Sequence, residues 1–192
     1  LTSLCVVACL LMAGCIGGGE EPHSFNGDPL ETNPAHRFTL VDQNGDSWSL
    51  SQAEGNITIL AFIFARCPDI CITVSMNINW VLDHLEPEDR DQVQVVSVTV
   101  DPWSDTPEAL KEFSGARSAD WPHLTSPDAG QHPGEEHTYT DMELIWGAYS
   151  VGLSMVETND EREYIMDHSL PTLILDRDLV KRVVWLGAEW DP

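Results

Sequence analysis

The chain of 192 residues is long enough for one ordinary domain with an appendage. Acidic residues outnumber basic ones by 32 to 9, and the formal net charge is -23. This balance excludes nucleic acid as a partner, because binding nucleic acid requires a dense Lys/Arg surface. The acidic residues are spread through the whole chain, which is typical of a folded surface adapted to concentrated salt, so we expect an extreme halophile as the source.

Residues 4–16 form an apolar run that is shorter than the roughly 20 residues needed to cross a bilayer. The run therefore predicts a signal peptide over residues 1–15. It ends in Leu11-Met12-Ala13-Gly14-Cys15, which resembles a lipobox, a motif whose cysteine is lipidated and becomes the mature N-terminus. We expect a lipid anchor on Cys15 and a location on the extracytoplasmic face of the cell membrane. The alternatives are a cleaved signal peptide without lipid and a short uncleaved anchor.

The segment 16–33 is rich in Gly, Pro and polar residues without periodicity, which predicts a flexible tether. The folded domain is predicted over residues 34–192. Its first element is an N-terminal β-hairpin, because two short alternating runs, 38–41 and 47–50, flank the turn pair Asn44-Gly45.

The middle of the chain predicts a strand-helix-strand unit. Residues 56–65 are almost continuously apolar and rich in β-branched and aromatic types, as in a strand covered on both faces. Apolar residues then recur at helical spacing from Ile70 to Leu85, and a second apolar run, 93–100, predicts another strand.

The remaining elements follow from caps, turns and apolar runs. Thr106-Pro107-Glu108 begins a helix, with an N-cap residue, a proline at the first helical position and an early acid. The further predictions are a loop over 126–140, a helix over 141–149 and strands over 164–166, 172–176 and 181–186. The whole pattern predicts an α/β domain with a central, mostly parallel sheet flanked by helices.

The segment Cys67-Pro68-Asp69-Ile70-Cys71 lies where the buried strand gives way to the helix. Unpaired backbone N–H groups and the helix dipole favour thiolate over thiol at that position. Two cysteines about one helical turn apart can either close a disulfide or bind one small soft ion. With an imidazole as third ligand, Cu(I) is favoured, since Zn(II) usually takes a fourth protein ligand.

The third ligand is predicted to be His168, which lies in Met166-Asp167-His168-Ser169-Leu170-Pro171-Thr172, directly before an apolar strand. In a doubly wound sheet, loops at strand ends gather at one edge, so a residue entering a late strand can approach the first strand-helix junction. His84 lies about three helical turns beyond Cys71 and is too far away.

Other polar residues are interpreted more conservatively. Asp101, at the end of the second predicted strand, either shapes the field near the cysteines or caps the following turn, and we favour the second role. His123, His132 and His137 lie in or near an acidic loop and are interpreted as solvated residues rather than as a second metal site.

These motifs together resemble the SCO/SenC family of copper chaperones for cytochrome oxidase assembly. The resemblance covers roughly residues 38–186 and includes the two-cysteine motif, Val98-Thr99-Val100-Asp101-Pro102 with Asp105-Thr106-Pro107-Glu108, and Asp167-His168. It implies a thioredoxin-like fold and copper ligands at Cys67, Cys71 and His168, with Cu(I) favoured over Cu(II). The implied partner is the dinuclear copper site of cytochrome oxidase subunit II or another copper protein.

Two features depart from a simple copper chaperone. Ile72 stands where family members commonly carry proline, which leaves the ligands intact. Leu170-Pro171-Thr172 resembles the cis-proline segment of thioredoxin-type reductases, so we expect Pro171 to be cis. The alternative function is therefore a thiol-disulfide oxidoreductase that reduces the client's copper-binding cysteines, with Cys67 as nucleophile and Cys71 resolving. A purely structural disulfide is less favoured, because so short a loop restrains the unfolded chain little.

Overall fold

The computed structural model describes residues 27–131, 139–157 and 164–187. The predicted signal peptide with Cys15, most of the predicted tether, and His132 and His137 lie outside the described residues. The elements are β1 (Asp28–Pro29), β2 (Thr39–Val41), β3 (Ser47–Ser49), the 3-10 helix η1 (Leu50–Ala53), β4 (Ile57–Ile63), α1 (Ile70–His84), α2 (Pro87–Arg90), β5 (Val93–Thr99), α3 (Pro107–Arg117), β6 (His123–Leu124), α4 (Thr140–Ala148), β7 (Gly152–Glu157), β8 (Tyr164–Ser169), β9 (Pro171–Leu175) and β10 (Lys181–Leu186).

A six-stranded sheet in the order β1-β10-β9-β4-β5-β6 forms the centre of the described structure. The pairings of β4 with β5 and of β5 with β6 are parallel, whereas β9 is antiparallel to both β4 and β10. The sheet is thus mixed rather than mostly parallel. The reason is local, because the short turn after Leu175 returns the chain directly into β10 and forces an antiparallel pair.

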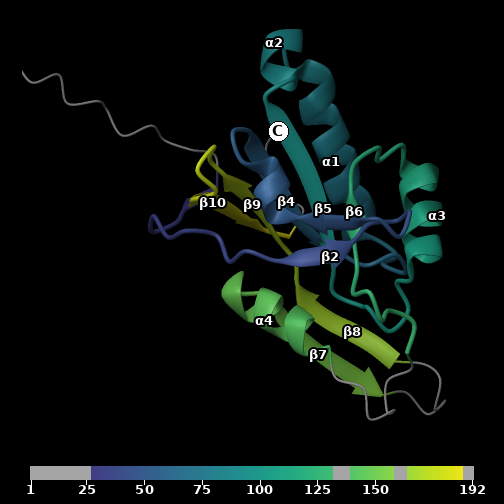
Figure 1. Cartoon of the computed structure of the whole chain (residues 1–192). Coiled ribbons are helices and arrows are strands. Elements are labelled where there is room, and N and C mark those ends of the chain that lie inside the picture. The colour runs from purple at the N-terminus through teal and green to yellow at the C-terminus, as the bar shows by residue number, and fades with distance from the viewer. Residues whose placement is uncertain (1–26, 132–138, 158–163, 188–192) are drawn as a thin grey trace, which may run out of the picture.

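The elements of the strand-helix-strand unit form as predicted. Residues Thr58 to Ile63 of β4 are all buried, which explains the unbroken apolar run. Figure 1 shows α1 on the far side of the sheet from β2, and the Asn79 amide of α1 donates to the Arg117 carbonyl at the end of α3. On the opposite face, Phe62 packs against Tyr149 at the end of α4, with ring centroids 5.5 Å apart. Helices therefore cover the sheet on both faces and leave the strand ends to form loops.

The predicted hairpin is present and pairs Thr39 with Ser49 and Val41 with Ser47. Gly45 has φ +82°, a left-handed conformation that glycine adopts without strain. The Asp42 carboxylate closes the turn by accepting hydrogen bonds from the backbone N–H groups of Asn44 and Asp46. Within the range predicted as a tether, Asp28 and Pro29 form β1 on the edge of the sheet beside β10.

Two features of the C-terminal half differ from the sequence predictions. The sequence predicted no strand over Gly152–Glu157, yet β7 forms there and pairs with β8 in a separate two-stranded sheet. His123 is not a solvated loop residue, because it lies in β6 and is fully buried between the rings of Phe113 and Trp121.

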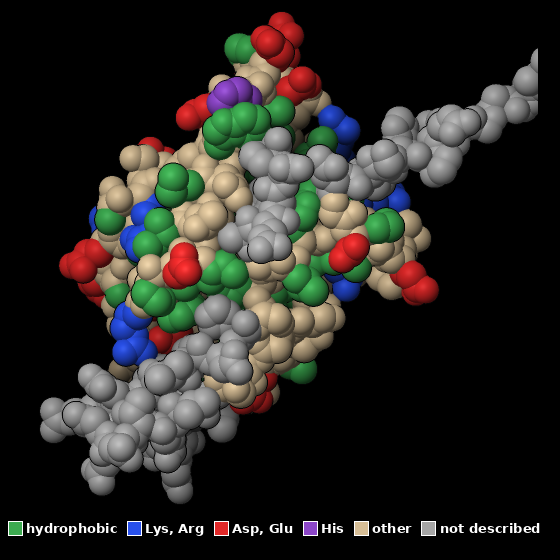
Figure 2. Space-filling model, turned by 180° about the vertical axis from the view of Figure 1, so that it is seen from behind, with side chains coloured by type: hydrophobic (Ala, Val, Ile, Leu, Met, Phe, Trp, Pro, Cys, Tyr) green, Lys and Arg blue, Asp and Glu red, His purple; other side chains and the backbone are tan. Residues whose placement is uncertain are grey.

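The surface carries its acidic residues in scattered positions. Figure 2 shows Asp and Glu side chains at many places across one face, with only a few Lys and Arg side chains between them. Among the described residues, no helix has both the length and the apolar character that a bilayer crossing requires.

Candidate functional site

The two cysteines lie where β4 ends and α1 begins. The chain leaves β4 at Ile63 and makes a turn in which the Cys67 N–H donates to the Phe64 carbonyl at 3.2 Å. Helix α1 starts three residues after Cys67, so Cys71 is in its first turn. A buried strand and an amphipathic helix therefore hold the two sulfur-bearing residues on either side of a short loop.

Neither Cys67 nor Cys71 forms a disulfide, and both thiols are almost completely enclosed. The exposed fraction is 4% for Cys67 and 0% for Cys71. The backbone N–H of Cys71 donates to the Cys67 Sγ at 3.3 Å, so the start of the helix points a donor at that sulfur. One turn later, the Ser75 hydroxyl donates to the Cys71 carbonyl at 2.8 Å. The sulfur of Cys67 thus faces the positive end of α1, as the sequence predicted.

Burial dominates the electrostatics of Cys71. Loss of solvation raises the pKa of the Cys71 thiol well above its usual range, and the hydrogen bond and charge of Cys67 raise it further. The surroundings of Cys71 therefore favour the protonated thiol over the thiolate in the absence of a bound cation. A cation that binds both sulfurs would supply the positive charge that this enclosed pair lacks.

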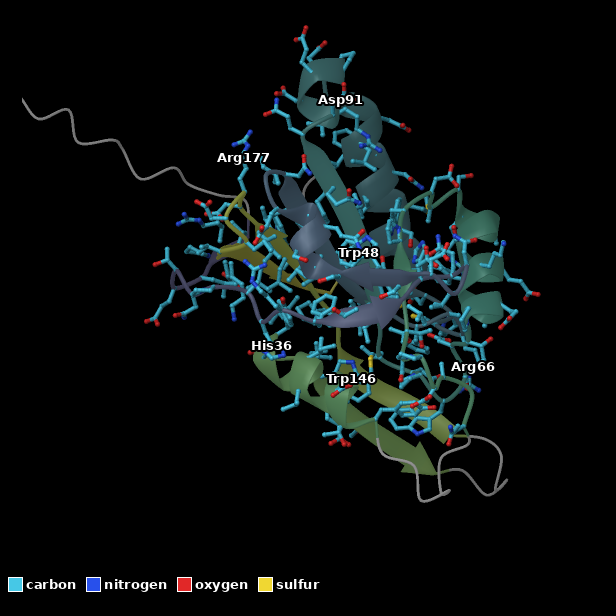
Figure 3. All side chains as sticks on the ribbon, in the orientation of Figure 1. His36, Trp48, Arg66, Asp91, Trp146 and Arg177 are labelled. Atoms are coloured by element: carbon cyan, nitrogen blue, oxygen red, sulfur yellow. The ribbon has the colours of Figure 1, made fainter. Side chains whose placement is uncertain are left out.

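An ion pair holds the residue just before Cys67. Arg66 Nη2 lies 3.0 Å from Asp101 Oδ2, and the Asp101 carboxylate is fully buried whereas the Arg66 side chain is about half exposed. The Asp101 carboxylate therefore contacts the residue next to Cys67, and its negative charge is paired there with the Arg66 guanidinium. Figure 3 shows Arg66 and Trp146 toward the end of the molecule opposite Asp91.

A second carboxylate from the same loop contacts the cysteine loop. Asp105 Oδ2 accepts the backbone N–H of Ala65 at 3.0 Å and the hydroxyl of Thr99 at 2.5 Å. Burial raises the pKa of Asp105 to about 7, while the hydrogen bond from Thr99 lowers it and the charge of Asp101 raises it. Two carboxylates on one loop therefore fasten two successive residues of the segment that leads to Cys67.

Helix α4 packs against the end of β5 and the loop that carries Asp101 and Asp105. The indole N–H of Trp146 donates to the Thr99 carbonyl at 3.1 Å. The ring of Trp103 lies 6.1 Å from that of Trp146 and 5.4 Å from that of Tyr139. An aromatic cluster thus packs the loop after β5 against α4 and restrains the carboxylates that face the cysteine loop.

The predicted third ligand, His168, lies on β8, where its backbone pairs with that of Leu153. Strand β9 is antiparallel to β4 and pairs Thr172 with Ala61, so the start of β9 lies beside the end of β4 that leads to the cysteines. The side chain of His168 lies outside the described residues. Its role as a ligand therefore stays a prediction, and within the described ranges no three His, Cys, Asp or Glu side chains form a metal-binding group.

The prediction of a cis bond before Pro171 is wrong, because the Leu170–Pro171 peptide bond is trans. Pro171 is the first residue of β9 and pairs with Leu186, and the extended backbone of a strand continues through a trans bond without a turn. This finding removes one residue-level argument for the oxidoreductase alternative.

Sequence reasoning did not assign Thr99 or Asp105 to the site. Both residues belong to a motif quoted for the family resemblance, but only Asp105 contacts Ala65, 40 residues away in the chain, and Thr99 acts through its hydrogen bond to Asp105. A signal was present, because Asp105 is an acidic residue in the loop that follows the buried strand β5, and this loop leaves the same sheet edge as the loop after β4.

Comparison with known protein families shows to which family the chain belongs. The SCO1/SenC family model matches residues 27–184, a range that includes both cysteines, Asp105 and His168. The chain belongs to the SCO1/SenC family. An SCO2-like protein of Rickettsia prowazekii is 32% identical to it over 142 residues, which are 73% of this chain and 63% of the relative. The chain thus spans a little under two thirds of the length of that SCO relative.

Solved SCO structures confirm the thioredoxin-like fold. Bradyrhizobium japonicum ScoI, solved with copper bound, is 27% identical, with a TM-score of 0.66 over 80% of this chain and 88% of that one. The apo Sco1 protein of Thermus thermophilus is 24% identical, with a TM-score of 0.70 over 85% of this chain and 88% of its own. The mixed sheet flanked by helices is therefore the fold of this SCO1/SenC member.

Proposed function

We propose that this protein is a copper metallochaperone that binds copper through Cys67, Cys71 and His168. The observation that carries the proposal is the pair of reduced, enclosed thiols at the start of α1, joined by the hydrogen bond from the Cys71 N–H to the Cys67 sulfur. The cargo would be delivered to the dinuclear copper site of cytochrome oxidase subunit II.

The donor set supports copper as the cargo. Two thiolates select soft ions, and hard ions such as Mg²⁺ and Ca²⁺ prefer oxygen ligands. Two sulfurs with one neutral imidazole suit three-coordinate Cu(I). The SCO relative from Bradyrhizobium japonicum was solved with copper bound, which agrees with this chemistry.

Proton competition follows from the enclosed thiols. Binding of Cu(I) by both sulfurs releases two protons, so the affinity should fall by up to about 100-fold for each pH unit below the pKa values of the thiols. Oxidation of Cys67 and Cys71 to a disulfide removes both donors and should abolish binding. Release to a client would proceed by exchange of these ligands for those of the client.

The test is a Cu(I) titration of the reduced chain against a competing chelator. We expect one ion per chain, at least a tenfold loss of affinity in His168→Ala, and no loss in His84→Ala. His84 is a matched control because it is exposed on α1 and contacts the Trp80 carbonyl. Equal affinities for the wild type and His168→Ala would refute the assignment of His168.

The second candidate is a thiol-disulfide reductase acting on the client's cysteines. Its support is that Cys67 is the less enclosed cysteine and receives a helical N–H at its sulfur, which favours the nucleophilic anion. A disulfide-reduction assay separates the two functions. Turnover by the copper-free protein that His168→Ala leaves unchanged would favour the reductase.

We also propose that the protein is held at the extracytoplasmic face of the membrane through a lipid on Cys15. The support is the lipobox-like end of the apolar run and a solved family member from Bacillus anthracis described as a SCO1/SenC family lipoprotein. Mass spectrometry of the mature N-terminus tests the proposal. An unlipidated N-terminal peptide, or one that begins at another residue, would refute it.

A further inference from the structure

Asp105 connects the loop after β5 to the loop that carries Cys67. One of its carboxylate oxygens, Oδ2, accepts the N–H of Ala65 at 3.0 Å and the hydroxyl of Thr99 at 2.5 Å. The backbone N–H of Asp105 donates to the Asp101 carbonyl at 2.8 Å, which fixes the carboxylate-bearing loop itself. The Ala65 N–H is thus held at a point two residues before Cys67.

The burial of Asp105 is costly for a residue with only a structural role. The residue has no exposed surface, and its Oδ1 atom is buried without a hydrogen-bond partner in the described part of the chain. A buried carboxylate with one unpaired oxygen is less favourable than a neutral group with the same shape. The Asp105 charge also adds to the burial and the Cys67 contacts that raise the pKa of Cys71.

We propose that Asp105 is a positioning residue of the dithiol site. By accepting the Ala65 N–H, it holds the turn from Phe64 to Cys67 in the conformation in which the Cys67 sulfur receives the Cys71 N–H. Both disulfide closure and binding of one ion require the sulfurs to stay close, so both depend on this turn. The copper part of the inference rests on the proposed function, and the redox part does not.

The redox readout uses a balanced exchange with glutathione. The thiols of Cys67 and Cys71 react with one glutathione disulfide, so the intramolecular disulfide forms and two glutathione thiols leave with the protons. The equilibrium constant of this exchange measures how closely the protein holds its two thiols. A loosened turn lowers that constant and leaves the fold's other contacts in place.

The variants separate the acceptor from the charge. Asp105→Ala removes the acceptor and should lower the exchange constant at least tenfold, which corresponds to about 30 mV for a two-electron couple. Asp105→Asn retains an amide oxygen for the Ala65 N–H and should stay within about threefold of the wild type. Thr99→Val, which removes the hydroxyl that orients the carboxylate, should lower the constant at least threefold.

The control is Asp176→Ala. The Asp176 carboxylate accepts the N–H groups of Asp178 and Val180 in the turn between β9 and β10, and β9 ends there beside the start of β4. Asp176 thus also accepts backbone hydrogen bonds in a turn, but this turn lies beside the start of β4, whereas the cysteines follow the end of β4. Its loss should lower the melting temperature and leave the exchange constant unchanged.

The experiment uses the full chain, with folding of each variant verified by circular dichroism, and Cu(I) affinity is measured in parallel. A tenfold lower exchange constant and a similar loss of Cu(I) affinity in Asp105→Ala, with Asp105→Asn close to the wild type, would support the inference. Unchanged constants in folded Asp105→Ala and Thr99→Val would overturn it. If Asp105→Ala does not fold, Thr99→Val decides. Wild-type protein that fails to bind Cu(I) would instead refute the proposed function, while the exchange constants still test the positioning role.

Discussion

Replacing His123 with glutamine is expected to remove a pH-dependent loss of stability from the protein. His123 has no exposed surface in β6, its Nε2 lies 3.0 Å from the Ala119 carbonyl, and its Nδ1 is buried without a partner among the described residues. Burial lowers the pKa of His123 from 6.5 to about 4, and the nearby charge of Arg117 lowers it further, against the hydrogen bond to Ala119. The folded protein therefore keeps this imidazole neutral where the unfolded chain protonates it.

The size of the effect follows from the shift in pKa. A difference of about 2.5 units at about 1.4 kcal/mol per unit gives about 3 kcal/mol. The folded-state pKa is the lower one, so the stabilisation is fully present above pH 6.5 and is lost as the pH falls toward 4. Between pH 7 and pH 4.5, the loss is about 2 kcal/mol.

Urea unfolding followed by tryptophan fluorescence, at fixed ionic strength and at several pH values from 7 to 4.5, measures this effect. The side-chain amide of glutamine can donate to the Ala119 carbonyl without titrating, so the wild type should lose about 2 kcal/mol relative to His123→Gln over this range. Asp105 has a raised pKa and an opposite pH dependence, but it is present in both proteins and cancels in the difference. A difference in stability that stays constant from pH 7 to pH 4.5 would refute the reasoning.

Two further variants test contacts around the site. Thr106→Ala removes the side-chain oxygen that accepts the Ala109 N–H at the start of α3. The free energy of unfolding, measured by urea titration, should fall by about 1 kcal/mol. An unchanged value would mean that this cap does not stabilise α3. Arg66→Gln leaves the buried Asp101 carboxylate without its guanidinium partner, so the free energy of unfolding should fall by about 1–3 kcal/mol. The same change should speed the alkylation of Cys67 by iodoacetamide. Unchanged stability and an unchanged alkylation rate would show that the ion pair does not restrain the loop.

The sequence is most informative where burial and local geometry act alone. The run from Ile57 to Ile63 is apolar because both faces of β4 are covered, and α3 begins at Pro107 because Thr106 caps it. The hairpin turn at Gly45 requires a left-handed residue, which the sequence provides. In each case, the cause lies within a few residues, so the pattern predicts the element.

The remaining features depend on contacts between distant segments. Strands β7 and β8 are short and pair with each other, and the residues of one strand do not indicate which other segment it pairs with. The mixed order of the sheet arises from the turn after Leu175, which determines the direction of β10. The contact of Asp105 with Ala65 spans 40 residues and forms only because both loops leave the same edge of the sheet.

The candidate site was predicted in part. The position of Cys67 and Cys71 at the end of a buried strand follows from the sequence and is confirmed. The cis bond before Pro171 was wrong, because similarity of a short segment does not determine the backbone where that segment begins a strand. His168 as third ligand stays a prediction, since its side chain lies outside the described residues.

X-ray absorption at the copper edge of the reduced chain loaded with one equivalent of Cu(I) tests the central claim most directly. Two sulfur scatterers near 2.2 Å and one nitrogen scatterer near 2.0 Å, roughly, are expected for two thiolates and an imidazole. In His168→Ala, the nitrogen contribution should disappear while both sulfurs remain. A copper shell with fewer than two sulfurs, or one that the loss of His168 leaves unchanged, would contradict the account.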